Sequence, residues 1–316
     1  MILITGGLGY LGGRIAAQLI LAGLKVKIGS SRKNPKIPKA LSSCDIVYID
    51  FFDNKSLESA CNKVSIILHL AGINAYNSED DPESALLVNG LGTLKLLKAA
   101  EKEGVHRFLF FSTMHVYGSP LMNKIDETKV PSPSNHYSIS NRLAEDYVIH
   151  ANQYGKISGA IVRLSNAVGK PINDESNCWS LVVNDLCQQA VEFNYLKLTS
   201  DGKQQRDFIP IADICDAVLF LIELSDNQYS GQIFNLGGAV FTIYEIALLI
   251  AERNNSIFGT TIEIEVEKNP KKEIISNTLY YHTNKLANLG FKQNNNLSSE
   301  IDLLLQFCAN KSNMVS

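Results

Sequence analysis

The chain has 316 residues, of which 45% are apolar and 19% charged, and its formal net charge is −3. This is the composition of an ordinary globular protein, long enough for one large α/β domain or two lobes that share a core. The charge gives no reason to expect nucleic acid or a membrane as a partner, and no apolar run approaches a membrane span. The start, MILITGG, enters an apolar strand directly, so we expect no secretory signal and a cytoplasmic protein.

The cysteines are scattered along the chain, with no CxxC pair and no histidine at metal-ligand spacing. They are Cys44, Cys61, Cys178, Cys187, Cys215 and Cys308. In a chain of this size the pattern predicts reduced, mostly buried thiols rather than a disulfide framework, and no metal site.

The first half alternates short apolar runs with amphipathic stretches. The expected strands are 2–5, 24–28, 46–49, 65–69, 107–111 and 160–164, and the expected helices are 10–21, 54–62, 82–101 and 138–151. The strand sequences are continuously apolar, which is typical of strands that are buried on both faces by crossover helices. The pattern therefore predicts an α/β fold with a doubly wound parallel Rossmann sheet.

The alternation of strands and helices becomes less regular after Ser165. A loop rich in Pro and Asn at 170–177 precedes expected helices at 179–190 and 209–224 and a strand at 232–236 that rejoins the sheet. From Thr242 onward we expect two helical stretches around an alternating strand at 261–267. We interpret 1–165, with about 208–236, as a dinucleotide-binding domain, and about 166–207 with 237–316 as a smaller, discontinuous α+β substrate lobe.

A glycine-rich stretch, TGGLGYLG, connects the first strand to the first helix. It fits GxGxxG through Gly7, Gly9 and Gly12, and GxxGxxG through Gly6, Gly9 and Gly12. Glycines at such a turn let the backbone approach a pyrophosphate and let the helix pack closely on its strand. The helix N-terminus then offers free N–H groups to the phosphates, so this stretch predicts a dinucleotide site.

The end of the second strand bears on which dinucleotide binds. An acid usually stands there to bind the ribose 2′-hydroxyl of NAD, but this chain has Ser30, Ser31, Arg32 and Lys33. Hydroxyls and an arginine can hold a 2′-phosphate, so NADP is the preferred cofactor, with NAD as the alternative. Otherwise Arg32 and Lys33 belong to a solvated loop.

The chain resembles the extended short-chain dehydrogenases/reductases, the NAD(P)-dependent epimerase/dehydratase group that acts on nucleotide sugars. In chain order the resemblance rests on TGGLGYLG, Asp50-Phe51, His69-Leu70-Ala71-Gly72, Asn89 with Gly92-Thr93, Ser112-Thr113, Val116-Tyr117-Gly118, Tyr137, Arg163-Leu164-Ser165-Asn166, Gln205-Arg206-Asp207-Phe208 and Phe234-Asn235-Leu236-Gly237. It implies that the cofactor is bound by Gly6, Gly9, Tyr10, Leu11, Gly12, Ser30, Ser31, Arg32, Asp50, Phe51, Leu70, Ala71, Gly72, Asn89 and Tyr137.

The same resemblance implies a catalytic pair and a substrate. Thr113 would bind the reacting sugar oxygen, and Tyr137 would be the acid/base. Asn166 and Arg206 would contact a nucleotide-diphosphate sugar. The residue types agree with these roles, because two hydroxyls can pass a proton to a carbonyl and an arginine fork suits a diphosphate.

One position departs from the family pattern YxxxK. Four residues after Tyr137 the chain carries Asn141 instead of the lysine that binds the nicotinamide ribose and lowers the tyrosine pKa. A cation about 5 Å away, at an effective dielectric near 20, is worth roughly 3 kcal/mol, or about two pKa units. Asn141 can bond a ribose hydroxyl but brings no charge, and Arg142 points around the helix away from Tyr137. Tyr137 should therefore ionise near its ordinary value of about 10.

Two histidines stand where they could compensate. His115 lies two residues after Thr113, and His136 immediately precedes Tyr137. We hypothesise that His115 takes part in proton transfer; the alternative is that it bonds a backbone group. Met114 and His115 also occupy positions where sugar 4,6-dehydratases of the family carry acids, which argues against water elimination.

Three activities remain open from the sequence. They are reduction of a 4-keto sugar with exchangeable NADPH, 4-epimerisation with bound NAD, and a non-catalytic NAD(P)-binding sensor or scaffold that lost turnover with the lysine. The resemblance also implies surface-polysaccharide biosynthesis and a homodimer, in which helices 82–101 and 138–151 form a four-helix bundle. The apolar surface of the first helix would come from Leu86, Leu87, Leu91, Leu94 and Leu97.

Overall fold

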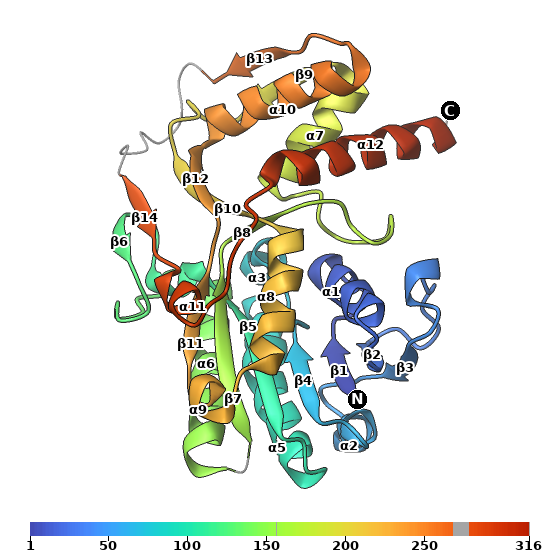
Figure 1. The fold of residues 1–316 in the computed structure, drawn as a ribbon, viewed down its shortest axis with the longest axis vertical. Coiled ribbons are helices and arrows are strands. Elements are labelled where there is room, and N and C mark those ends of the chain that lie inside the picture. Colours follow the sequence, from blue (N-terminus) through green and yellow to red (C-terminus); the bar gives the residue numbers. More distant parts are fainter. Residues whose placement is uncertain (156, 268–277, 316) are drawn as a thin grey trace.

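The computed structural model of the chain describes residues 1–155, 157–267 and 278–315, so part of the expected substrate lobe lies outside it. Its largest sheet has seven strands in the order β11-β7-β5-β4-β1-β2-β3, and all neighbours are parallel (Figure 1). The strands are β1 (Ile2–Thr5), β2 (Val26–Ser30), β3 (Asp45–Tyr48), β4 (Ile66–His69), β5 (Arg107–Thr113), β7 (Ser158–Leu164) and β11 (Ile233–Leu236). The order reverses between β1 and β4, which confirms the doubly wound fold and marks the switch point where such sheets bind ligands.

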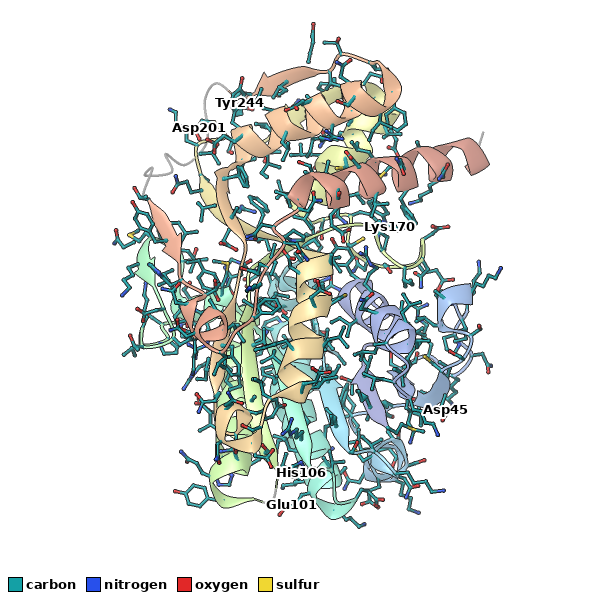
Figure 2. All side chains as sticks on the ribbon, in the orientation of Figure 1. Asp45, Glu101, His106, Lys170, Asp201 and Tyr244 are labelled. Atoms are coloured by element: carbon teal, nitrogen blue, oxygen red, sulfur yellow. The ribbon has the colours of Figure 1, made fainter. Side chains whose placement is uncertain are left out.

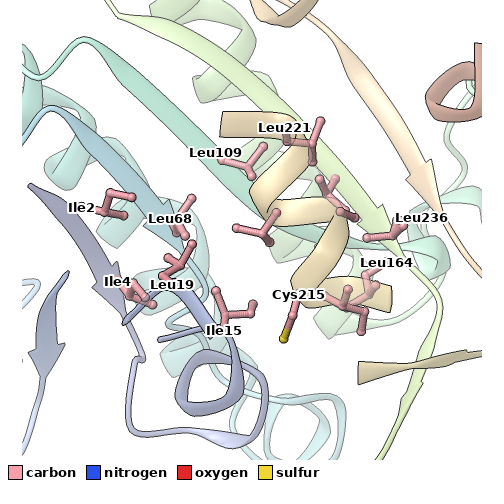
Figure 3. Close-up of a cluster of buried hydrophobic side chains, with 14 of the residues drawn as sticks. Ile2, Ile4, Ile15, Leu19, Leu68, Leu109, Leu164, Cys215, Leu221 and Leu236 are labelled. Carbon is pink, nitrogen blue, oxygen red and sulfur yellow. The ribbon is translucent and has the colours of Figure 1, made fainter. Parts of the chain in front are cut away.

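Helices cover both faces of this sheet. On one face lie α1 (Tyr10–Leu21) and α8 (Ile211–Glu223), whose apolar side chains meet those of the strands (Figure 3). On the other lie α2 (Asn54–Cys61), α5 (Thr93–Lys102) and α6 (His136–Tyr154). This two-sided burial explains why the strands are continuously apolar.

The helix expected at 82–101 is present as one unbroken helical stretch, 82–102, whose middle is π-helical. A short helix α3 (Ala75–Asp80) comes first, followed by α4 (Pro82–Ala85), a π-helical segment η2 (Leu86–Gly92) and then α5. Close approaches accompany the π segment: a Cβ on Gly90 would lie 2.6 Å from a methyl carbon of Leu143 in α6, and one on Gly92 3.1 Å from the ring of Phe51. Leu86, Leu87 and Leu91 are exposed, and Leu97 is buried on the face that covers the sheet, which we also expect of this helix.

Several further boundaries differ from expectation by one to three residues. The helix expected at 209–224 begins at Ile211, because β10 (Gln205–Pro210) runs into it and Pro210, with an extended ψ of 137°, precedes the first turn. The second strand is shifted to 26–30, which makes Ser30 its last residue. The helix expected at 179–190 is α7 (Val182–Phe193), which ends at the left-handed Asn194.

The remaining elements pack beyond the carboxyl ends of the sheet strands (Figure 1). β8 (Asn166–Val168), β10 and β12 (Ala239–Thr242) form a three-stranded sheet, and β9 (Tyr195–Leu198) pairs with β13 (Glu263–Val266). α7, α10 (Ile243–Phe258) and α12 (Leu297–Val315) enclose a separate apolar cluster with these strands. The expected tail of two helices around a strand is therefore found in α10, β13 and α12, while the domain bounds stay a prediction.

Smaller elements complete the described chain. They are β6 (Asn123–Ile125), which pairs with β14 (Leu279–Tyr281), the 3-10 turns η1 (Lys39–Leu41) and η3 (Met114–Tyr117), α9 (Asp226–Tyr229) and α11 (Asn284–Asn288). All six cysteines are free thiols, and five are buried. Within the described residues, no group of three or more His, Cys, Asp or Glu side chains is placed to hold a metal ion, and no helix has the length and apolarity to cross a bilayer.

Candidate active site

The glycine loop leaves no room for side chains. Gly6 has a left-handed φ of 69°, and a Cβ there would lie 3.0 Å from the backbone nitrogen of Ala71. A Cβ on Gly12 would lie 2.3 Å from the carbonyl oxygen of Gly6. Gly9 is the N-cap of α1, whose first turn has no side-chain cap and no acidic residue. The loop thus brings bare backbone and an uncapped helix N-terminus to the switch point, which fits a dinucleotide pyrophosphate.

The side chains of Tyr10 and Leu11 point elsewhere. The Tyr10 hydroxyl donates a hydrogen bond to the Gly169 carbonyl at 2.8 Å, in the connection that follows β8. Leu11 packs against the apolar cluster beside the sheet. These two residues would therefore contact a cofactor through their backbone atoms.

A fully buried histidine fixes the end of β4 beside the glycine loop. His69 Nδ1 lies 2.7 Å from Thr5 Oγ1, and Nε2 lies 2.9 Å from Thr93 Oγ1. The Thr93 hydroxyl donates to the Asn89 carbonyl, so it accepts from Nε2–H, and Nδ1 accepts from Thr5. Burial lowers the pKa of His69 to about 3, so the ring is neutral. The Thr5 hydroxyl also accepts a hydrogen bond from the backbone N–H of Ala71 at 3.2 Å, which connects this hydrogen-bond network to the loop after β4.

Asn89 is used by the protein itself. Its Oδ1 accepts the Ile73 N–H at 2.7 Å, and its Nδ2 donates to Ser140 Oγ at 3.0 Å. The carboxamide braces the strand-end loop, including Gly72, against α6. Leu70, on the same loop, packs against the core. These contacts position the loop that the resemblance assigns to the cofactor.

The end of β2 presents the hydroxyls and the arginine that were singled out from the sequence. Ser30 is buried, and its Oγ accepts the Arg32 N–H at 3.1 Å, while Ser31 is exposed. The Arg32 guanidinium is ion-paired with Glu175, a residue of the connection between β8 and α7. Sequence reasoning missed Glu175, because no local pattern links it to a position 143 residues earlier.

Asp50 and Phe51 follow β3. The Asp50 carboxylate accepts the Phe52 N–H at 2.8 Å, so it shapes its own turn. The ring of Phe51 meets that of His69 edge-on, with centroids 5.9 Å apart. Phe51 thus lies beside the end of β4, against Gly92 of the π segment.

Thr113 and Tyr137 meet at the carboxyl end of the sheet. Thr113 is the last residue of β5 and is buried, and Tyr137 is the second residue of α6. Asn135 and Ser138 form a capping box that fixes this helix start. Burial raises the pKa of Tyr137 above its ordinary value, and a hydrogen bond with the Thr113 side chain lowers it. The tyrosine is thus a weaker acid than expected from the sequence, which placed its pKa near 10.

Asn141, at the position of the missing lysine, and its neighbour Arg142 both interact with other groups of the protein. The Asn141 side chain is buried, and its Nδ2 donates to the backbone carbonyl of Tyr137 at 2.8 Å. Arg142 pairs with Glu145 at 3.0 Å and with Asp146. In this structure neither side chain is directed at the tyrosine hydroxyl.

Glu145, a further residue that sequence reasoning missed, anchors α6 to the sheet. Its side chain is fully buried and accepts two hydrogen bonds from Arg163, at 2.9 and 2.7 Å, and one from Ser112 at 2.6 Å. The available signal was a charged residue one position after Ala144 and three before Val148, two apolar residues that face the sheet. Since Ser112 precedes Thr113, this network holds β5 and α6 together behind the Thr113–Tyr137 pair.

His115, Arg206 and Asn166 come together at the same end of the sheet. Burial lowers the pKa of His115, and the nearby Arg206 guanidinium lowers it further. Arg206 donates to Gln204 at 3.0 Å rather than to Asp207, and burial lowers its pKa. Asn166 donates to the Asp207 carbonyl at 2.7 Å, so it fastens β8 to β10. An imidazole whose pKa is lowered and a partly buried cation thus lie near Thr113, whose Oγ1 accepts a hydrogen bond from the backbone N–H of His115.

Comparison with known proteins finds similar chains that cover most of this one. A UDP-glucose 4-epimerase of Rhizobium leguminosarum bv. trifolii is 28% identical over 299 residues, which cover 90% of this chain and 89% of that protein. A UDP-N-acetyl-alpha-D-glucosaminuronate decarboxylase of Bacillus cytotoxicus is 28% identical over 247 residues, 74% of each chain.

Among solved structures, the UDP-glucose 4-epimerase of Thermus thermophilus in complex with NAD has the same fold. Its TM-score is 0.80 at 24% identity, over 97% of this chain and 98% of that one. The model of the NAD dependent epimerase/dehydratase family matches residues 2–237, most of the chain. The protein therefore belongs to the NAD dependent epimerase/dehydratase family.

Proposed function

We propose that the protein is an NAD(P)-dependent nucleotide-sugar oxidoreductase that exchanges a hydride at a sugar ring carbon, by 4-epimerisation or by reduction of a 4-keto sugar. The observation that carries the proposal is the hydrogen-bonded Thr113–Tyr137 pair at the carboxyl end of β5, on the sheet edge that bears the glycine loop. Relatives named UDP-glucose 4-epimerase support the substrate class. Surface-polysaccharide biosynthesis is the proposed setting.

The dinucleotide would lie over Gly6, Gly9 and Gly12, where added Cβ atoms would clash with backbone. When bound, it supplies the hydride donor and acceptor. Ser30 and Arg32 at the end of β2 support a preference for NADP, and NAD is the alternative that the relatives favour.

The chain's own groups would position the sugar and move its proton. Thr113 would hold the reacting oxygen, and Tyr137 would donate or accept its proton. Arg206, with Asn166 beside it, would bind the diphosphate through the guanidinium fork. His115, held neutral by burial and by Arg206, would share the proton transfer, because a neutral imidazole can both accept and donate.

We also propose a homodimer formed through a four-helix bundle. Leu86, Leu87 and Leu91 of the π segment are exposed, and Ile139 of α6 is 47% exposed. α6 packs against this π segment through Leu143 and Gly90, so these side chains belong to neighbouring elements. Exposed apolar side chains gathered in this way are typical of a surface that another subunit covers.

The first experiment is to denature freshly purified protein and identify any released nucleotide and its redox state. Stoichiometric NAD or NADH, with interconversion of UDP-glucose and UDP-galactose, would establish the epimerase and overturn the NADP preference. Empty protein that binds NADPH more tightly than NADH and reduces a 4-keto sugar would establish the reductase. Binding without turnover of any nucleotide sugar would favour the third candidate, a sensor or scaffold, on the strength of Asn141.

A further inference from the structure

The connection between β8 and α7 lies along helix α1. Its first residues are fastened in turn: the Gly169 carbonyl accepts the Tyr10 hydroxyl at 2.8 Å, and the Lys170 carbonyl accepts Arg14 Nη1 at 3.1 Å. A Cβ on Gly13 would lie 2.4 Å from Ile172, so this side chain sits directly on the helix. Figure 2 labels Lys170 on this connection. The connection therefore runs from β8, which begins with Asn166, along α1, which follows the glycine loop.

Glu175 lies at the end of this run and meets Arg32 in an ion pair. The residues around it are also anchored. Ser176 is buried and donates to Asn173 Oδ1 at 3.1 Å, and the Cys178 N–H donates to the Ser176 carbonyl at 3.0 Å. The carboxylate therefore reaches Arg32 from a fixed backbone.

The partner of Glu175 occupies the position that reads the adenosine ribose. Arg32 follows Ser30, the last residue of β2, and the end of that strand is where this fold distinguishes a 2′-hydroxyl from a 2′-phosphate. We propose that Glu175 is a specificity-determining residue, which holds the Arg32 guanidinium and repels a 2′-phosphate and so limits the preference for NADP over NAD. This inference rests on the proposed dinucleotide-dependent function.

The expected size of the effect follows from exposure. The side chains of Arg32 and Glu175 are 52% and 44% exposed, so their pairing is weak and can be displaced by a stronger anion. Removing the Glu175 carboxylate frees the Arg32 guanidinium and removes a negative charge near the 2′-phosphate. We expect about a fivefold gain in NADPH affinity, since exposed pairs contribute factors of this order. NADH has no group at this position, and its affinity should change less than twofold.

The test is titration of NADPH and of NADH into the full chain by calorimetry, for wild type, Glu175→Gln and Asp174→Asn. Asp174 is the adjacent exposed acid, so its variant matches the charge change without touching the ion pair. Glu175→Gln should raise the ratio of NADPH to NADH affinity about fivefold, and Asp174→Asn should leave this ratio unchanged. In the double variant Arg32→Gln/Glu175→Gln the gain should be absent, because the guanidinium that the carboxylate holds is missing. An unchanged ratio in Glu175→Gln, or an equal gain in Asp174→Asn, would overturn the inference while leaving the proposed function intact. Wild-type protein that binds neither dinucleotide would overturn both.

Discussion

The side-chain amide of Asn141 donates a hydrogen bond to the backbone carbonyl of Tyr137, 2.8 Å away and one turn earlier in α6. The position that carries a lysine in the family pattern is therefore turned along its own helix and brings no charge to the tyrosine. Burial meanwhile raises the pKa of Tyr137. Because both effects disfavour the tyrosinate, the phenol is held in its protonated form.

Replacing Asn141 with lysine should lower the pKa of Tyr137 by about two units, because a cation about 5 Å away is worth roughly 3 kcal/mol at an effective dielectric near 20. If a tyrosinate is the working base, the alkaline rise of the pH–rate profile should move to lower pH by that amount. The measurement is turnover of the nucleotide sugar as a function of pH, with an ultraviolet titration of tyrosinate in the same variant.

Asn141→Gln is the matched control, because it keeps a neutral amide and changes only the length of the side chain. Its pH–rate profile should coincide with that of the wild type. A lysine variant whose profile also coincides with the wild type would mean that ionisation of Tyr137 does not limit the reaction.

His115→Phe should lower the turnover rate about 100-fold, the usual order of a single acid–base contribution. Burial and Arg206 lower the pKa of His115 below its ordinary value, so the imidazole is neutral at mildly alkaline pH, and the loss should be uniform between pH 7.5 and 9. Steady-state rates at a series of pH values test this. Normal turnover of the variant over that range would end the hypothesis that His115 moves a proton.

His136→Phe serves as the comparison for this experiment. His136 also adjoins Tyr137, but its side chain is exposed, and its backbone N–H donates to Glu79 at 3.1 Å. Its substitution should leave the rate within a factor of about two, as is usual for exposed surface positions. If both substitutions lowered the turnover rate strongly, the cause would be a disturbed start of α6 rather than the loss of the His115 imidazole.

The fold was predictable where local pattern and tertiary structure agree. The bounds of β1 and α1 match the prediction residue for residue, because the fully buried strand is followed directly by the glycine-rich turn. The same holds for the glycine loop itself, whose spacing already encodes the close approach of Gly12 to Gly6. Such features depend on neighbours in the sequence.

The mistakes arose where distant residues decide the conformation. The π segment at Leu86–Gly92 keeps a helical apolar period, and no local pattern in the sequence shows its close approach to Phe51 and Leu143. Ile209 continues the apolar pattern of α8 but is paired with Ala167 in a sheet. No sequence pattern brings Glu175 to Arg32, because an ion pair between distant segments depends on the whole fold.

Lowering the pH should destabilise the protein through His69. Its pKa is about 3 in the folded protein and about 6.5 when unfolded, so between these values the unfolded chain binds the additional proton. The free energy of unfolding should then fall by about 1.4 kcal/mol per pH unit below 6.5 from this group alone. Urea unfolding of wild type and His69→Gln at pH 7, 6 and 5 measures the contribution.

The His69→Gln variant should be less stable at pH 7, because it disturbs the bonds to Thr5 and Thr93, but its stability should depend less on pH. The same substitution at His150, an exposed residue of α6, is the control and should leave the stability at pH 7 close to that of the wild type. Equal slopes for wild type and His69→Gln would show that His69 is not held neutral by burial.

Breaking the ion pair between α1 and α12 should cost far more stability than breaking another pair on the same helix. Glu300 is 2% exposed, and it accepts Arg14 through both oxygens, at 2.6 and 3.1 Å, and the Ala212 N–H at 3.1 Å. Glu300→Ala leaves the Arg14 guanidinium in a largely buried place without its partner, at a cost of about 3 kcal/mol. Asp302→Ala, which frees the more exposed Arg253, should cost much less. Urea unfolding of the two variants makes the comparison, and similar losses would mean that the Arg14–Glu300 pair does not hold α12 against α1.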